Sequence, residues 1–251
     1  MPSDLVKSTA LYSMKNDDIN ISEVHLWSLD IESVSTSVSF LNLFFDIHSK
    51  LSSDELARAN LFLRDVDRVR WMTVRSALRY ILAEVTCQQP EDIIFVYNAF
   101  GAPRHSTNKP YFNVSHSENR ALIAISDVAK IGIDTENPER KKILPQIMAS
   151  FLSKEEKHFF HSNQGELEYR LLQHWVRKEA LVKAMGVGFS RDIRTLTIQP
   201  KLSGRIITEV DGITYHIQDI KDQYDWPVAL ASNRLHQRIL HYSSHDYFSC
   251  F

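Results

Sequence analysis

The sequence Trp175-Val-Arg-Lys-Glu-Ala-Leu-Val-Lys-Ala-Met-Gly-Val-Gly188 predicts a helix that ends at a glycine. Its Ala, Leu and Met residues favour helix, and no Gly or Pro interrupts it before Gly186, which stands where a C-cap is expected. Trp175, Glu179 and Lys183 follow one another at intervals of four, so ring, carboxylate and ammonium share one stripe of the helix. Taken alone, the stripe also fits an ordinary solvated Glu–Lys pair.

Two acidic residues stand close together earlier in the chain, in the segment Ile131-Gly-Ile-Asp-Thr-Glu136. On a strand, Asp134 and Glu136 point to the same face. Carboxylates that close raise each other's pKa unless a cation neutralises them, and a few carboxylates with substrate phosphate are how Mg²⁺ is usually bound. With Glu179 they predict a magnesium–phosphate site, although a D-x-E pair alone is more often simply solvated.

The segment Phe112-Asn-Val-Ser-His-Ser117 reads as a strand that ends in a polar turn. Its Ser and Asn side chains can bond the local backbone, as turn residues commonly do. Hydroxyl, imidazole and free backbone amides at such a turn can also hold a phosphate.

Taken in this order and at these separations, the three segments resemble the 4'-phosphopantetheinyl transferase family. The family pattern F-N-x-S-H-S, G-[IV]-D-x-E and W-x-x-K-E-A-x-x-K-x-x-G-x-G is matched by 112–117, 132–136 and 175–188. The resemblance implies an α+β fold of two similar lobes in a pseudo-twofold arrangement, with the coenzyme between them. We expect a flexible tail over 1–20, an N-terminal lobe over 21–128 and a C-terminal lobe carrying the metal site over 129–251.

The resemblance also implies an activity, the transfer of 4'-phosphopantetheine from coenzyme A to a serine of an acyl or peptidyl carrier protein, with release of 3',5'-ADP. Asp134, Glu136 and Glu179 would bind Mg²⁺, and Glu179 would act as base directly or through a metal-bound water. Lys183 and Lys178 would offset oxygen charge as point charges. Ser115, His116 and Lys183 would bind the coenzyme's phosphates. Length and layout favour the longer, monomeric type that serves secondary metabolism.

Four arginines, Arg64, Arg68, Arg75 and Arg79, are spaced so that they fall on one face of a predicted helix. They fit either a solvated basic stripe or a phosphate clamp, because a guanidinium matches phosphate oxygens. The family places basic residues of this helix near the coenzyme's 3'-phosphate, and Arg75 is the expected contact.

One departure from the family concerns a coenzyme-binding lysine. The family commonly carries Gly-Lys-Pro before its F-N-x-S-H-S segment, whereas this chain has Gly101-Ala102-Pro103. Lys109 or Arg104 can supply the missing cation, or the contact is absent.

Composition narrows the class of protein. The 251 residues are 43% hydrophobic, enough for a substantial core, and the net charge of −2 argues against a general nucleic-acid binder. Cys87 and Cys250 form no metal or disulfide pattern, which fits a reducing compartment. No run approaches the ~20 apolar residues of a membrane span, and the N-terminus lacks the features of a signal peptide. We expect a cytoplasmic protein without nucleic-acid or membrane partners.

Periodicity and capping signals predict the remaining elements. Ser52 with Glu55 and Ser153 with Glu156 form two L-S-x-x-E capping boxes, each followed by helix, and suggest a weak internal repeat. The first helical region is long enough to break once before Val85. Strands are expected at 24–29, 93–97, 122–125, 195–198, 205–210, 213–217 and 228–231, an apolar patch at 40–47, a loop at 98–109 and a short helix at 143–149.

Two other classes remain open on the sequence. A magnesium-dependent pyrophosphate hydrolase would also need three acids and two lysines. A non-catalytic coenzyme- or carrier-binding relative would retain the fold, although its acids and lysines would be free to decay.

Overall fold

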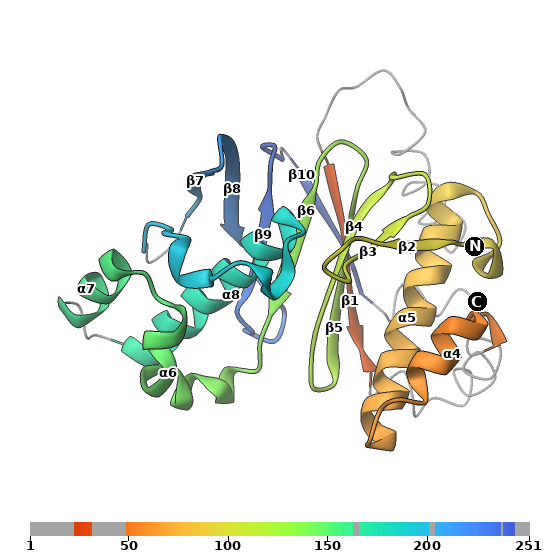
Figure 1. Ribbon diagram of the computed structural model, residues 1–251, viewed down its shortest axis with the longest axis horizontal. Helices are drawn as coiled ribbons and strands as arrows, with labels where there is room; N and C mark the ends of the chain where they lie inside the picture. The colour runs from red at the N-terminus through yellow and green to blue at the C-terminus, as the bar shows by residue number, and fades with distance from the viewer. Residues whose placement is uncertain (1–22, 32–48, 163–165, 201–203, 237, 244–251) are drawn as a thin grey trace.

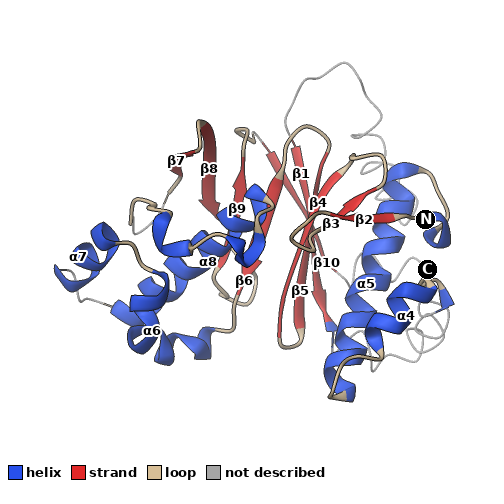
Figure 2. Ribbon diagram, viewed as in Figure 1, coloured by secondary structure: helices blue, strands red, loops and turns tan. Residues whose placement is uncertain are grey.

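The computed structural model describes residues 23–31, 49–162, 166–200, 204–236 and 238–243 (Figure 1). The expected tail over 1–20 and the apolar patch over 40–47 lie outside these ranges. The described part is a mixture of helices and strands, which confirms the α+β class (Figure 2). None of its helices is both long and apolar enough to cross a membrane.

Two four-stranded sheets form the centre of the molecule. The first has the order β10-β1-β5-β4, in which β10 runs parallel to β1 and the other neighbours are antiparallel. Its strands are β1 (Glu23–Asp30), β4 (Tyr111–Ser117), β5 (Arg120–Ser126) and β10 (Arg238–Ser243). The second sheet is antiparallel in the order β6-β9-β8-β7. It consists of β6 (Ile131–Thr135), β7 (Ile206–Val210), β8 (Ile213–Asp219) and β9 (Val228–Ser232).

The chain's last described strand returns to the first sheet, since β10 pairs with β1. The first sheet therefore contains strands from both predicted lobes, 21–128 and 129–251. Side chains add to this strand pairing. The Tyr242 hydroxyl lies 2.9 Å from His25 Nδ1, and the Tyr242 ring stacks on Trp27 with 4.9 Å between the centroids.

One long helix covers the outer face of each sheet (Figure 1). Helix α5 (Asp65–Thr86) packs on the first sheet through Leu78, Ile81 and Leu82, and Cys87 ends it in the left-handed conformation of a C-cap. Helix α8 (Leu167–Met185) covers the second sheet through Val176, Ala180 and other apolar residues. The predicted break after the first capping box is present, between α4 (Ser53–Ala59) and α5.

The inner faces of the two sheets pack on each other. Their shared apolar cluster contains Val24, Leu26, Leu122, Ala124, Ile131, Ile133, Ile220, Val228 and Leu230. Strands β5, β6 and β9 are consequently buried on both faces along their whole length. The layers run helix, sheet, sheet, helix, and β4 and β6 come together where the sheets meet.

The remaining elements surround this core. Helices α6 (Leu144–Phe151) and α7 (Lys154–Ser162) pack with α8 around the buried rings of Phe151 and Phe160. The short strands β2 (Phe95–Tyr97) and β3 (Pro103–His105) form a separate hairpin. Short 3₁₀ turns lie at 90–92, 138–143, 188–190 and 193–195.

Both predicted capping boxes are confirmed by their hydrogen bonds. Ser52 N donates to Glu55 Oε2 at 2.9 Å, and Glu55 N donates back to Ser52 Oγ at 3.3 Å. The same exchange joins Ser153 and Glu156, at 2.7 and 3.3 Å. Each pair satisfies two backbone donors at a helix start.

Two secondary-structure predictions need correction, and one strand was not predicted. The predicted strand at 195–198 is absent, because the Ile198 amide donates to Glu156 Oε1 at 2.9 Å instead of to a neighbouring strand. The predicted loop at 98–109 contains β3, which pairs with β2. Strand β10 was not expected, since its partner β1 lies at the opposite end of the sequence.

Candidate active site

A glycine lets α8 lie directly on β6. A Cβ added to Gly132 would fall 2.1 Å from the Ala180 carbonyl oxygen and 2.3 Å from the Ala184 amide nitrogen. Only a residue without a side chain fits so near a helix backbone. Since side chains alternate along a strand, Asp134 and Glu136 follow Gly132 on the same face of β6.

Asp134 and Lys183 meet across this contact. Lys183 Nζ lies 2.7 Å from Asp134 Oδ1 and donates to the Ile133 carbonyl oxygen at 3.1 Å. Asp134 is only 7% exposed, and Ser115 Oγ donates to the same Oδ1 at 2.7 Å. The ion pair therefore joins β6 to α8, and Ser115 of β4 in the other sheet holds its carboxylate in place.

Alternate side chains of β4 bond to β6 and join the edges of the two sheets. Asn113 Oδ1 accepts from the Ile133 amide at 3.0 Å, and Ser115 Oγ accepts from the Thr135 amide at 3.3 Å. Ser117 Oγ donates to Glu136 and accepts from the Asn137 amide at 3.2 Å. Asn113, Ser115 and Ser117 thus take the place of a backbone ladder, and the two serines also hold Asp134 and Glu136.

Ser115, which was expected to bind phosphate, uses its hydroxyl within the protein. Ser115 is buried, and its hydroxyl already donates to Asp134 and accepts from Thr135. Its neighbour His116 points to the other face of β4, because successive side chains alternate.

Glu136 lies at the rim of the cluster. Its Oε2 accepts from Arg140 Nη1 at 2.7 Å, and its Oε1 accepts from Ser117 and from the Asn137 amide, the latter at 2.9 Å. Arg140 is itself largely open to solvent, so this cation can move away without a burial cost.

Glu179 carries the most perturbed carboxylate of the site. Its pKa is raised from 4.5 to about 7, first because burial disfavours the charge, then because Asp134 repels it; Lys183 opposes the shift and Glu136 adds to it. At neutral pH the group therefore lies close to half ionised, which suits a general base.

The donor set suits a hard divalent cation in its chemistry. Asp134 and Glu136 both raise the pKa of Glu179, and oxygen ligands such as these carboxylates are those that Mg²⁺ prefers. Within the described ranges, however, no three His, Cys, Asp or Glu side chains are gathered as a metal site. Asp134 and Glu136 are instead held by Lys183 and Arg140.

Lys178 lies away from these acids. Its side chain is fully buried, and Nζ lies 2.6 Å from Glu156 Oε2. His174 Nε2 lies 3.0 Å from the other oxygen of Glu156. The structure therefore brings Lys183 to the acidic cluster but gives Lys178 a partner in the capping box of α7.

Three adjoining cavities follow the outer side of β4 beside the cluster. One, of about 310 Å³, is lined by Trp71, Arg75 and His116. A second, of about 460 Å³, lies between Arg70, His116 and Glu136. The third, also of about 460 Å³, runs from Asn113 to Lys183. His116, Trp71, Phe112 and Asn113 are each shared by two of them, so they form one cleft.

His116 stands at the junction of this cleft. Although the residue is exposed, the protein around its ring lowers its pKa from 6.5 by desolvation, and Lys183 and Arg70 lower it further. Arg70 was not selected from the sequence, where nothing separates it from the other arginines of α5. Its guanidinium donates to Asn119 Oδ1 at 2.7 and 3.1 Å.

The predicted arginine stripe divides into two parts. Arg64 and Arg68 pair on the surface with acids three residues away. Arg79 turns inward, where Nε donates to Glu55 Oε2 at 2.7 Å. Arg75 is 9% exposed, stacks between the rings of Trp71 and Phe95, and has a buried Nη1 without a hydrogen-bond partner. That nitrogen belongs to a residue lining the 310 Å³ cavity.

Of the two cations proposed to replace the family's lysine, Arg104 lines the cleft together with Ala102, and it donates to Asn108 at 2.6 Å. Lys109 is exposed and does not line the cavities beside β4. Trp175 packs edge-on against Phe151, with 5.1 Å between the ring centroids.

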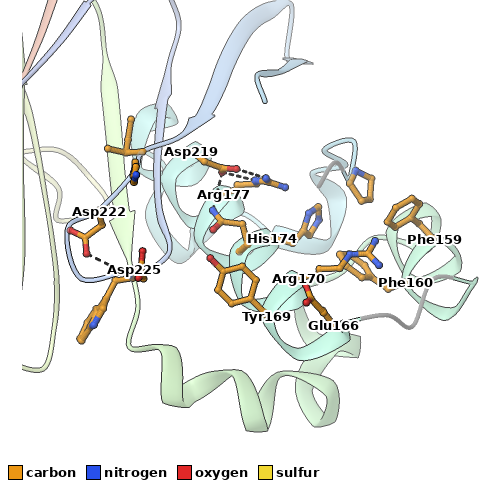
Figure 3. A pocket seen from close by; sticks show the side chains of 15 residues that line it. Phe159, Phe160, Glu166, Tyr169, Arg170, His174, Arg177, Asp219, Asp222 and Asp225 are labelled. Carbon is orange, nitrogen blue, oxygen red and sulfur yellow. Dashed lines mark hydrogen bonds and ion pairs between the residues drawn. The ribbon is translucent and has the colours of Figure 1, made fainter. Parts of the chain in front are cut away.

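A larger cavity of about 600 Å³ lies elsewhere, between α7, α8 and the loop after β8 (Figure 3). Arg177 and Asp219 are ion-paired on its wall at 2.5 Å, and Arg170 stacks near Phe159 and Phe160. None of the predicted site residues lines it.

Comparison with known proteins agrees with the residues gathered at β6 and α8. The model of the 4'-phosphopantetheinyl transferase superfamily matches residues 130–237, which include the Asp134, Glu136, Glu179 and Lys183 cluster. The 4'-phosphopantetheinyl transferase HetI of Nostoc sp. is 33% identical over 174 residues, 67% of this chain and 71% of HetI.

Two further relatives carry similar names. A Synechocystis sp. protein named for the same transferase is 30% identical over 201 residues, 74% of this chain and 82% of that protein. The 4'-phosphopantetheinyl transferase AcpT of Escherichia coli K12 is 31% identical over 124 residues, 47% of this chain and 58% of AcpT. The chain therefore belongs to the 4'-phosphopantetheinyl transferase superfamily. It is an enzyme of that transferase class.

Proposed function

We propose that the protein transfers 4'-phosphopantetheine from coenzyme A to a serine of an acyl or peptidyl carrier protein and releases 3',5'-ADP. The observation that carries the proposal is the contact of β6 with α8, which puts the Asp134–Lys183 pair beside a Glu179 of pKa about 7. Transfer breaks the bond between the phosphopantetheine phosphorus and the bridging pyrophosphate oxygen. The serine oxygen forms the new bond and gives up its proton.

Glu179 is the proposed acceptor of that proton. Its pKa near 7 lets it be ionised before the reaction and still hold a proton afterwards. Lys183, within reach of Asp134 and the cleft, would stabilise the negative charge that grows on the leaving 5'-phosphate of 3',5'-ADP. Lys178, the other predicted catalytic lysine, would act only through the fold, because its ammonium is buried against Glu156.

Magnesium is part of the proposal. Asp134, Glu136 and Glu179 would hold it, and the ion would supply positive charge to the diphosphate when bound. The exposure of Arg140 supports this, since that cation can leave Glu136. Ser115 and Ser117 would keep the two carboxylates of β6 in place from behind.

The coenzyme is proposed to lie along the cleft over β4. His116 and Arg70 offer cationic or donor groups to its phosphates, and the unpartnered Nη1 of Arg75 offers a third at the adjoining cavity. Arg104 is the better placed replacement for the family's lysine, while Lys109 remains a proposed contact from the loop. Ser115 would take part only by holding Asp134.

The protein substrate is proposed to be an acidic carrier of secondary metabolism, received by a monomer in the cytoplasm. Beside Glu136, Arg140 and Lys141 offer positive charge, and Ile143 and Ile147 are exposed next to them. The proposal keeps the predicted lobes, 21–128 and 129–251, as the two walls of the cleft, with β10 crossing between them.

Intact-mass measurement of a carrier protein tests the function. The carrier is incubated with this protein, coenzyme A and Mg²⁺, with and without a chelator. Transfer adds one phosphopantetheine to the carrier only when Mg²⁺ is free. Consumption of coenzyme without a mass gain would indicate a hydrolase, and coenzyme binding without either change would indicate a non-catalytic binder.

A further inference from the structure

The cleft has a bridge that neither the transfer chemistry nor the motifs account for. Asn98 lies in the turn between β2 and β3, and its Nδ2 donates to the Gly186 carbonyl oxygen at 2.7 Å. Gly186 is the C-cap of α8, the helix that carries Glu179 and Lys183. One side chain thus joins two segments that are 88 residues apart in the sequence.

The other end of the same carboxamide organises its own turn. Asn98 Oδ1 accepts from the amides of Phe100 and Ala102, both at 2.9 Å. The Asn98 backbone amide donates to the Ala102 carbonyl oxygen at 3.0 Å. Because all of these bonds start from one residue, the turn and the end of α8 are held at a fixed separation.

That separation is the width of the cavity of about 460 Å³ beside Lys183. Asn98, Ala102 and Pro103 line one side, and Lys183 and Gly186 line the other. The two walls also touch beyond the bridge, because a Cβ added at Gly188 would lie 3.6 Å from the Phe100 Cβ. A loss of the Asn98 bond would therefore let the two walls of a substrate cavity move apart.

We propose that Asn98 is a positioning residue for coenzyme binding, a clasp that holds the turn 98–102 against the end of α8. The proposal rests on the proposed function, because it takes the coenzyme to be the occupant of this cavity. Asn98 acts by fixing the turn against the C-terminal end of α8, and not by contact with the reacting atoms.

The substitution Asn98→Asp distinguishes the bond to α8 from the bonds within the turn. Aspartate keeps an acceptor for the Phe100 and Ala102 amides but has no donor for Gly186, so only the bond across the cavity is lost. Asn98→Ala removes both. If Asn98 served its turn alone, Asn98→Asp would behave as the unaltered protein and only Asn98→Ala would be impaired.

Asn108→Asp is the matched control for charge. Asn108 also lines this cavity, but its side chain bonds Arg104 and not α8. The substitution adds the same negative charge to the same cavity and leaves the clasp intact. An effect of Asn98→Asp beyond that of Asn108→Asp therefore reports the lost bond.

Calorimetric titration with coenzyme A, together with steady-state transfer to a carrier, tests the proposal. We expect Asn98→Asp and Asn98→Ala to raise Kd and KM for coenzyme A about tenfold relative to Asn108→Asp, as loss of one well-placed hydrogen bond allows. Values of kcat at saturating coenzyme and KM for the carrier should stay within about twofold of the control, a split that general loosening of the fold would not produce.

A Kd for coenzyme A that is the same in Asn98→Ala as in the unaltered protein would overturn the role of Asn98, with transfer by the unaltered protein intact. An unaltered protein that neither binds coenzyme A nor modifies a carrier would overturn the proposed function, and this role of Asn98 with it.

Discussion

Lys178 Nζ lies 2.6 Å from Glu156 Oε2, and neither side chain is exposed to solvent. The first half of the chain repeats the arrangement, since Arg79 Nε lies 2.7 Å from Glu55 Oε2. In both halves a capping-box glutamate binds the buried cation of the following long helix. The weak L-S-x-x-E repeat therefore has a structural counterpart in two buried ion pairs.

The two lysines of α8 should separate stability from catalysis. Lys178→Met leaves Glu156 buried without its closest cation, and we expect a loss of about 3 to 5 kcal/mol in the free energy of unfolding. The fraction that remains folded should still transfer. Lys183→Met should cost much less stability, because Lys183 is partly exposed, but should abolish transfer.

Urea unfolding and carrier modification at a temperature where both variants are folded give the two quantities. A Lys178→Met protein that is fully folded and inactive would show that Lys178 has a catalytic role.

Gly132→Ala should prevent the close packing of β6 and α8. The added Cβ would meet helix backbone at 2.1 and 2.3 Å, which no side-chain rotation can relieve. We expect a loss of at least about 3 kcal/mol of stability or a failure to fold. Ala129→Gly, at a buried alanine just before β6, serves as the comparison, and thermal unfolding of the two variants measures the difference. A Gly132→Ala protein as stable as the wild type would contradict the contact.

Glu179 should destabilise the metal-free fold at neutral pH. Its folded pKa of about 7 lies above its ordinary 4.5, so the folded state binds more protons between these values and stability falls as pH rises through this window. Glu179→Gln removes the charge. With a chelator present we expect the variant to be more stable than the wild type by about 2 kcal/mol at pH 8 and equal to it near pH 4, while transfer is lost.

Chemical denaturation at the two pH values measures this difference. Equal stabilities at pH 8 would show that the carboxylate is not held in an unfavourable environment.

His25 should make the fold sensitive to acid. Burial lowers its pKa from 6.5 to about 4, with Glu23 opposing the shift, so the unfolded state binds more protons between pH 6.5 and 4. Stability is then fully present above pH 6.5 and is lost as pH falls, by about 2 to 3 kcal/mol at pH 4. His25→Gln should remove this part of the pH dependence. Thermal unfolding across the range provides the check, and identical slopes for both proteins would contradict it.

Local patterns in the sequence were enough for several parts of the site. The Gly186 C-cap, both capping boxes and the shared face of Asp134 and Glu136 depend on residues within one turn or one strand. Such features follow from backbone geometry alone.

Other parts depend on where distant segments meet. The clash that a side chain at position 132 would cause exists only once α8 lies on β6, and β10 finds β1 from the opposite end of the chain. The hydroxyl of Ser115 is a group that can bind phosphate, but in the structure it donates to Asp134. Helix geometry alone distinguishes Lys178 from Lys183. Five residues turn a helix by about 140°, so the two lysines lie on different faces of α8.

The most direct test of the central claim is the intact mass of a carrier protein treated with the wild type and with Asp134→Asn, each with coenzyme A and Mg²⁺. Asparagine keeps the size of the side chain but removes the charge that pairs with Lys183. The account predicts a phosphopantetheine-sized gain with the wild type and none with Asp134→Asn at equal thermal stability. Transfer by Asp134→Asn at the wild-type rate would contradict it.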